Sequence, residues 1–164
     1  MLELDNNQFA YRQPEDYLDT QGAEIGVVWR WNDFKYFFGY THADVEEHNA
    51  TGVRMAPLMP KDRVNNVFVY EREDDFRVGL EAYYYGRQEL TDGSMARDFW
   101  IFGLMIEKIF DEDFSIFLNF ENFSDTRQTR FGSIYTGSKL NPIFSDIFAP
   151  MDGFIINGGI KLQL

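Results

Sequence analysis

Three groups of residues in this 164-residue sequence are of the types that could carry out chemistry. The first combines two imidazoles with three carboxylates, which are common ligands of divalent metal ions. Its members are His42, Asp44, Glu46, Glu47 and His48. Their spacing matches no known metal site, and the segment runs from the end of a predicted strand into a polar loop. We therefore interpret this group as a solvated acidic loop, and the sequence predicts neither a metal site nor a cofactor.

The second group consists of neighbouring carboxylates, which could support acid–base catalysis. They are Asp74 and Asp75, and the acidic run 111–113. Aspartate is also favoured in tight turns, because its side chain accepts hydrogen bonds from nearby backbone N–H groups. Turn chemistry explains these residues more simply than catalysis does. Since the sequence also contains no cysteine, and so no thiol nucleophile, we expect that the protein is not an enzyme.

The third group lies in a long predicted loop, 127–151, which mixes cationic and aromatic side chains. Loops of this composition often form recognition surfaces. We expect ligand contacts at Arg127, Arg130, Tyr135 and Phe144. The residues alone leave open the alternative that this loop only packs over its neighbours.

Composition narrows the class of protein that must position these residues. The net charge of -12 argues against a nucleic-acid partner, because an acidic surface repels phosphate. Aromatic residues make up 18% of the chain, mostly as phenylalanine and tyrosine, which favours strands over helices. The length suits a single unit spanning residues 1–164.

Seven segments have the period-two pattern of β-strands, in which alternate side chains point to opposite faces. They are 22–31, 34–43, 64–72, 77–87, 99–110, 114–125 and 154–164. In most of them the charges fall on one parity and leave the other apolar. In segment 114–125, for example, the apolar parity holds Phe114, Ile116, Leu118 and Phe120. The polar parity holds Asn119 and Glu121. In 34–43 and 64–72, aromatic residues on both parities leave the orientation open.

The connections between these segments alternate in length. Short polar turns are predicted at 32–33, 73–75 and 111–113, and long irregular links at 46–62, 88–98 and 127–152. In an antiparallel meander, alternate connections lie at opposite ends of the sheet. The chain is therefore predicted to be all-β: an antiparallel meander of transmembrane β-strands, with short periplasmic turns and long extracellular loops, as in outer-membrane barrels.

Two alternatives remain open on this pattern. A soluble, lipocalin-like barrel also alternates, with its apolar parity turned inward around an apolar ligand, and parity alone does not separate inward from outward. A small autonomous outer-membrane barrel would need a signal peptide, and the N-terminal segment has neither a basic start nor an apolar run.

Several stretches resemble the C-terminal third of TonB-dependent outer-membrane receptors, in the order found in that family. A Thr-x-Gly-x-Glu motif that opens a late strand is matched by Thr20, Gly22 and Glu24, and a Tyr-Thr-x-x-Asp pattern by Tyr40, Thr41 and Asp44. The most specific match is the Glu-Asn-Leu/Phe-x-Asp motif of the penultimate strand, at Glu121, Asn122, Phe123 and Asp125. The resemblance covers about 19–164.

This resemblance implies a wall segment of a large barrel in the outer membrane of a Gram-negative bacterium. It implies that Phe114, Ile116, Leu118 and Phe120 face lipid, and that Asn119 and Glu121 face the interior. Such receptors import siderophores, corrinoids or glycans by binding at the outer loops, followed by a TonB-driven rearrangement of a plug domain. We expect seven to eight strands here, part of one within residues 1–13, with the plug and the TonB contact on a missing N-terminal part. The family usually ends in an aromatic residue, where this chain has Leu164.

Overall fold

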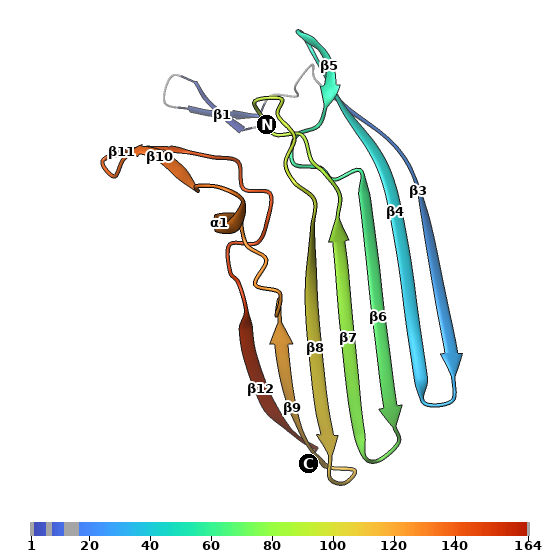
Figure 1. Cartoon of the computed structure of the whole chain (residues 1–164). Coiled ribbons are helices and arrows are strands. Elements are labelled where there is room, and N and C mark those ends of the chain that lie inside the picture. Colours follow the sequence, from blue (N-terminus) through green and yellow to red (C-terminus); the bar gives the residue numbers. More distant parts are fainter. Residues whose placement is uncertain (1, 6–7, 12–16, 164) are drawn as a thin grey trace.

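A computed structural model describes residues 2–5, 8–11 and 17–163. Its main element is one antiparallel sheet of seven long strands, which follow one another in space as they do in sequence (Figure 1). From one edge to the other the strands are β3 (Tyr17–Trp31), β4 (Phe34–Asn49), β6 (Asp62–Arg72), β7 (Phe76–Tyr85), β8 (Phe99–Ile109), β9 (Phe114–Glu121) and β12 (Ile155–Leu162). The predicted all-β antiparallel meander is thus confirmed.

Smaller elements extend the loops at one end of this sheet. β5 (Gly52–Met55) pairs with the end of β4, so the link 46–62 is less irregular than predicted. The last long loop contains α1 (Gln128–Phe131) and a hairpin of β10 (Tyr135–Ser138) and β11 (Asn141–Phe144). No helix in the described part of the chain is long and apolar enough to cross a membrane.

The part of residues 1–13 that the structure describes does not form the expected partial wall strand. β1 (Leu2–Asp5) and β2 (Gln8–Tyr11) instead pair with each other in a separate two-stranded sheet. The start of the wall also differs from the prediction: β3 begins at Tyr17, so the motif residue Thr20 lies inside the strand and does not open it. Leu164 lies outside the described residues.

Tight turns close the end of the sheet where the C-terminus lies (Figure 1). Asn32 and Asp74 adopt positive φ angles of 49° and 58°, which asparagine and aspartate tolerate better than most residues. Asp75 pairs with Arg72 and Lys108, and the Lys108 ammonium lowers the pKa of Asp75 below its ordinary value. These contacts support the interpretation of the paired carboxylates as turn residues.

The register divides the side chains of the wall into two faces. One face, called the inner face, carries Glu107, Arg77 and Lys161 and is partly covered by the long loops. The other, called the outer face, carries Leu80, Leu104 and similar residues. Met105 follows Leu104 in β8 and therefore points to the inner face, and Asn119, which pairs with Met105, lies on the inner face as well. Leu118 and Phe120 lie on the outer face, as the parity of segment 114–125 predicts.

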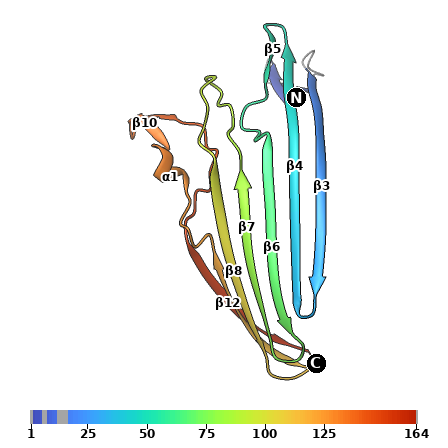
Figure 2. The ribbon, with the colours of Figure 1, turned by 45° about the vertical axis from the view of Figure 1, so that its right-hand side comes forward.

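The wall is a curved open sheet without the core of a compact protein (Figure 2). Its edge strands β3 and β12 do not pair with each other, and nearly all of their described residues are exposed. The surface area is 12060 Å², whereas a compact monomer of this mass exposes about 8,500 Å². A closed lipocalin-like barrel is therefore not formed, and the sheet has the shape of one sector of a larger wall.

Candidate ligand site at the loop end of the inner face

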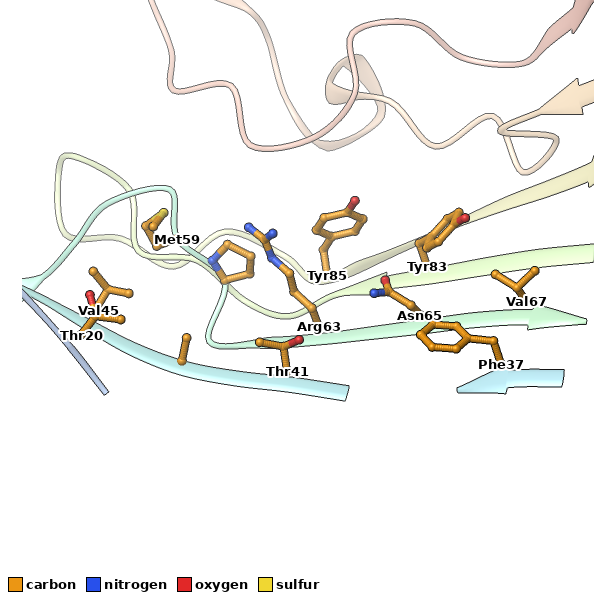
Figure 3. Close-up of a pocket in the computed structure, with 12 residues that line it drawn as sticks. Thr20, Phe37, Thr41, Val45, Met59, Arg63, Asn65, Val67, Tyr83 and Tyr85 are labelled. Atoms are coloured by element: carbon orange, nitrogen blue, oxygen red, sulfur yellow. The ribbon is translucent and has the colours of Figure 1, made fainter. Parts of the chain in front are cut away.

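A hollow with a volume of about 660 Å³ lies on the inner face near the long loops (Figure 3). It is lined by alternate residues of four neighbouring strands and by the 56–61 loop: Thr20, Phe37, Thr41, Ala43, Val45, Met59, Pro60, Arg63, Asn65, Val67, Tyr83 and Tyr85. The strands bring these residues together because inner-face positions of adjacent strands lie side by side. Its volume is in the range of small-molecule sites.

Arg63 is at the centre of this arrangement. Its guanidinium carbon lies 5.7 Å from the centre of the Tyr85 ring, within the range of a cation–π contact. A second hollow of about 310 Å³ shares Arg63, Tyr85 and Pro60 with the first and extends under the last long loop. Deeper along the wall, the Tyr83 hydroxyl donates to Glu81 at 3.0 Å.

Hydrogen bonds between loops hold the rim of the two hollows. The Leu58 N–H donates to the Glu89 carbonyl at 2.8 Å, which ties the 56–61 loop to the 86–98 loop. The buried Gln88 side chain donates to the Phe148 carbonyl at 3.3 Å, and the Thr91 hydroxyl donates to Asp146 at 2.8 Å. Three loops that are distant in sequence therefore form one braced rim.

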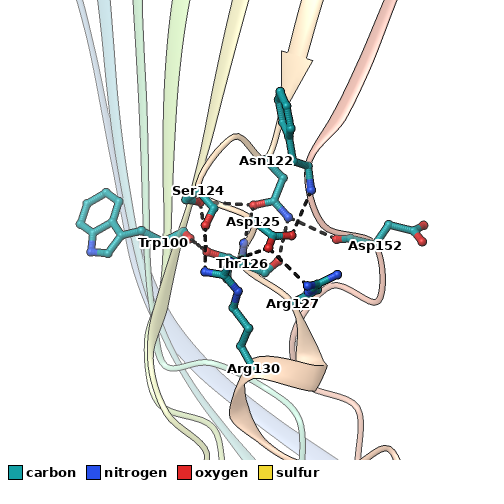
Figure 4. Close-up of polar contacts among 9 residues, drawn as sticks. Trp100, Asn122, Ser124, Asp125, Thr126, Arg127, Arg130 and Asp152 are labelled. Atoms are coloured by element: carbon teal, nitrogen blue, oxygen red, sulfur yellow. Dashed lines mark hydrogen bonds and ion pairs between the residues drawn. The ribbon is translucent and has the colours of Figure 1, made fainter.

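The predicted ligand contacts Arg127 and Arg130 lie at the start of the last loop, where both pair with Asp125 (Figure 4). The ion-pair distances are 3.4 Å and 2.5 Å. Arg130 also donates to the Ser124 carbonyl at 3.4 Å. In this structure the two cations hold the base of the loop, a role for which the sequence pattern gave no sign.

The other two predicted contacts, Tyr135 and Phe144, are paired across the β10–β11 hairpin, and their ring centres are 6.4 Å apart. Both rings are exposed, by 42% and 71%. The structure therefore brings the four predicted residues together as two separate pairs. The prediction missed Arg63, Tyr83 and Tyr85, although aromatic side chains on the polar parity of segment 77–87 were a visible signal.

Asn122, from the most specific of the motifs, joins the two ends of the last loop (Figure 4). Its amide nitrogen donates to the carbonyls of Thr126 and Asp152, at 2.7 and 3.2 Å, and its amide oxygen accepts from the Thr126 N–H at 3.0 Å. Asp125 adds a bond from the Phe154 N–H at 3.3 Å. This motif therefore works as a clamp that fixes where the loop leaves β9 and returns to β12.

We expect Asn122→Gly to loosen this loop and leave the wall intact. Glycine suits the positive φ of 48° at this position, so the change removes only the side-chain bonds, each worth about 1 kcal/mol. Trypsin cleavage after Arg127 and Arg130 should become at least about tenfold faster, because cleavage follows the population of the open loop. The control is Asn32→Gly, at an asparagine that also has a positive φ but lies in a turn at the other end of the sheet. It should leave the rate of cleavage after Arg127 and Arg130 unchanged. Equal cleavage rates in the two variants would contradict the clamp.

The histidine and carboxylate group at the end of β4 is divided between the two faces. On the outer face, the His42 ring contacts Asp62 at 2.8 Å and Asp44 at 3.2 Å. On the inner face, Glu47 pairs with Arg54 at 2.7 Å. The Asp44 carboxylate also raises the pKa of Lys61 in the adjoining loop. Within the described ranges, no three such side chains are placed to hold a metal ion.

Comparison with known proteins identifies the fold of this wall. No protein-family model matches the sequence, and no curated protein matches it. Among solved structures, the ferric-catecholate import receptor Fiu from E. coli K12 matches 98% of the chain with a TM-score of 0.61 at 16% identity. The receptor in the FpvAI–pyocin S2 complex matches 88% of it, with a TM-score of 0.57 at 17% identity.

Both matches are TonB-dependent receptors, so the chain has the fold of the barrel portion of such a receptor. It spans 23% and 20% of the two matched chains. The fold predicted from the motifs and the loop alternation is confirmed. The neighbours are transport receptors, which fits the expectation of a protein that is not an enzyme.

Proposed function

We propose that this chain forms the C-terminal seven strands of the barrel wall of a TonB-dependent receptor in a Gram-negative outer membrane, and that its loops help to bind a nutrient for uptake. The observation that carries this proposal is the division of the outer face into zones. An apolar band crosses the wall and is interrupted on β6 by Asn66, whose amide bonds to the Tyr36 hydroxyl and the Ala82 carbonyl. Aromatic side chains border the band at both ends. Polar residues lie beyond the aromatic borders.

Two aromatic belts border the band. The belt at the turn end contains Trp31, Phe34, Tyr70, Phe76, Phe110 and Phe114, several of which stack on one another. The belt at the loop end contains Tyr40, Tyr84, Trp100, Phe102, Phe123 and Phe154. Aromatic girdles at both interfaces are typical of barrels that cross a membrane.

The distance between the belts suits a bilayer. Phe76 and Tyr84 lie in these two belts on the same strand, β7, eight residues apart. At about 3.4 Å per residue they are roughly 27 Å apart along the strand, which corresponds to about 20 Å across a membrane for a strand tilted by ~40°. The apolar band of outer-membrane barrels is ~25 Å tall. We therefore propose outer-membrane lipid as the partner of the outer face.

The residues of the inner face are the basis for a second proposed partner. The middle part of this face combines apolar residues such as Val67, Val69 and Met105 with the polar residues Glu81, Asn119 and Glu121 around a hollow of about 560 Å³. Interfaces between domains are of this mixed, partly polar kind. We propose that a plug domain occupies this side in the complete receptor and that TonB acts through that domain, outside this chain.

The substrate is proposed at the level of class. Fiu imports a ferric catecholate, and a siderophore-type ligand is the nutrient that we propose here, ahead of a corrinoid or a glycan. Tyr135 and Phe144 on the exposed hairpin are the proposed first contacts. Arg127 and Arg130 are proposed to act beside them at the base of the same loop.

The test is to refold the chain in plain buffer and in detergent micelles and to compare far-UV circular dichroism and gel mobility before and after boiling. We expect stable β-structure only in detergent, with a mobility shift on boiling, because the apolar outer band needs a lipid-like solvent. A cooperative, soluble monomer in plain buffer would refute the proposal.

A further inference from the structure

We infer that Arg63 is the anion-binding residue of the two hollows at the loop end, and that their ligand carries a carboxylate or phenolate group on a flat ring. This inference rests on the proposed function of this surface as a ligand site. It identifies a residue that the sequence pattern did not indicate and a chemical class of ligand.

The first argument is the charge of the lining. The sequence contains 27 acidic residues, yet none of the described residues that line either hollow is an aspartate or a glutamate, and Arg63 is the one cation among them. The neighbouring hollows differ, since Asp92 and Asp146 line one and Glu81 and Glu121 line the other. In a chain with a net charge of -12, an acid-free surface around one arginine favours an anion.

The second argument is that no ion pair or hydrogen bond occupies the guanidinium of Arg63 in the part of the chain that the structure describes. Among the described residues no carboxylate lies within ion-pair distance of it, whereas Lys61 pairs with Asp44 and Arg54 with Glu47. Arg127 and Arg130 are both paired with Asp125. The contact that Arg63 does make, with the face of Tyr85, holds the guanidinium plane without consuming its fork of N–H donors. That fork matches the two oxygens of a carboxylate.

The third argument concerns the shape and polarity of the surroundings. Rings from the wall and the last loop surround Arg63: Tyr83, Tyr85, Phe99 and Phe148. Phe99 lies 6.4 Å from Phe148, centre to centre, and is itself buried. Flat apolar rings favour stacking with a flat ring of the ligand. Arg63 is exposed, so a neutral sugar that covered it would remove water from the guanidinium without supplying an anionic partner, which costs free energy.

The test uses the full chain in detergent micelles and two probes with the same ring, benzoate as the anion and benzyl alcohol as the neutral analogue. Binding is measured by saturation-transfer difference NMR, which detects weak ligands. We expect benzoate to bind and benzyl alcohol to bind at least tenfold more weakly. Arg63→Gln should weaken benzoate binding about tenfold or more, since charge-assisted hydrogen bonds are lost. Arg63→Lys should retain part of the binding. Arg54→Gln, which removes a cation that pairs with Glu47 and lies outside both hollows, should bind like the parent.

Several results would overturn the inference. They are the absence of benzoate binding, equal binding of the two probes, unchanged binding in Arg63→Gln, or a loss in Arg54→Gln as large as in Arg63→Gln. The boiling-dependent gel shift of the same samples shows that each variant is folded. If that shift is present and benzoate binding is absent, the inference fails while the proposed membrane role stands. If the chain is instead a soluble monomer without detergent, the proposed function fails on its own.

Discussion

Replacing Leu104 by lysine is expected to destabilise the chain in lipid by about 2–4 kcal/mol, whereas replacing its neighbour Met105 by lysine should cost less than about 1 kcal/mol. Leu104 is at the middle of β8 on the outer face, between Leu80 of β7 and Phe120 of β9. A charge at this depth would have to enter the apolar band. The side chain of Met105 points to the opposite face, so a charge there would not face lipid.

The pair of variants is a sharp test because the two residues are adjacent on one strand and at the same depth. Free energies of unfolding would be measured by urea titration of the refolded chain in lipid vesicles, followed by tryptophan fluorescence. A soluble barrel with its apolar parity buried would lose stability from Leu104→Lys in plain buffer as well. If Met105→Lys were the more damaging change in lipid, the assignment of the outer face would be wrong.

The architecture could be predicted because a sheet with two different faces produces a period-two pattern within each short segment of sequence. In segment 114–125, the two parities alone separated Leu118 from Asn119, and the structure places them on opposite faces. The turns were visible for the same reason, since Asn32 and Asp74 are suited to the positive φ angles that they adopt. Short-range rules of this kind need no knowledge of distant contacts.

The candidate site could not be predicted in the same way because it depends on contacts between distant segments. Arg63 and Tyr85 meet only because β6 pairs with β7 in one register. Arg127 and Arg130 looked like free cations in the sequence, and only the turn after Asn122 brings Asp125 between them. For 34–43 and 64–72, aromatic residues on both parities concealed the orientation, which the pairing of Lys35 with Val69 settles.

Replacing Glu107 by alanine is expected to cost roughly 2–3 kcal/mol of unfolding free energy. Its side chain is only 5% exposed and accepts from Lys161 at 2.7 Å, from Ser115 at 2.9 Å and from Arg77 at 3.2 Å. Because Arg77 and Lys161 are partly exposed, water can recover some of their lost interaction, so we place the cost below that of a fully buried pair.

The contacts of Glu107 also explain how the last strand is held. β12 forms backbone hydrogen bonds with β9 only, and Lys161 reaches across β9 to Glu107 on β8. Arg77 also pairs with Glu71, and Glu71 in turn pairs with Lys35 at 2.8 Å. The network therefore crosses the wall from β4 to β12 near the turn end. Loss of Glu107 should detach β12 before it disturbs the other strands.

Hydrogen exchange measured strand by strand separates this account from a general loss of stability. In Glu107→Ala, amide protection should fall first in β12 and β9, with smaller changes in β6 and β7. Glu121→Ala is the matched control, because this exposed carboxylate on the same face bonds only to Asn157 among the described residues. It should cost less than about 1 kcal/mol. Equal costs for the two glutamates, or uniform loss of protection in Glu107→Ala, would mean that the buried ion pairs do not secure the last strand.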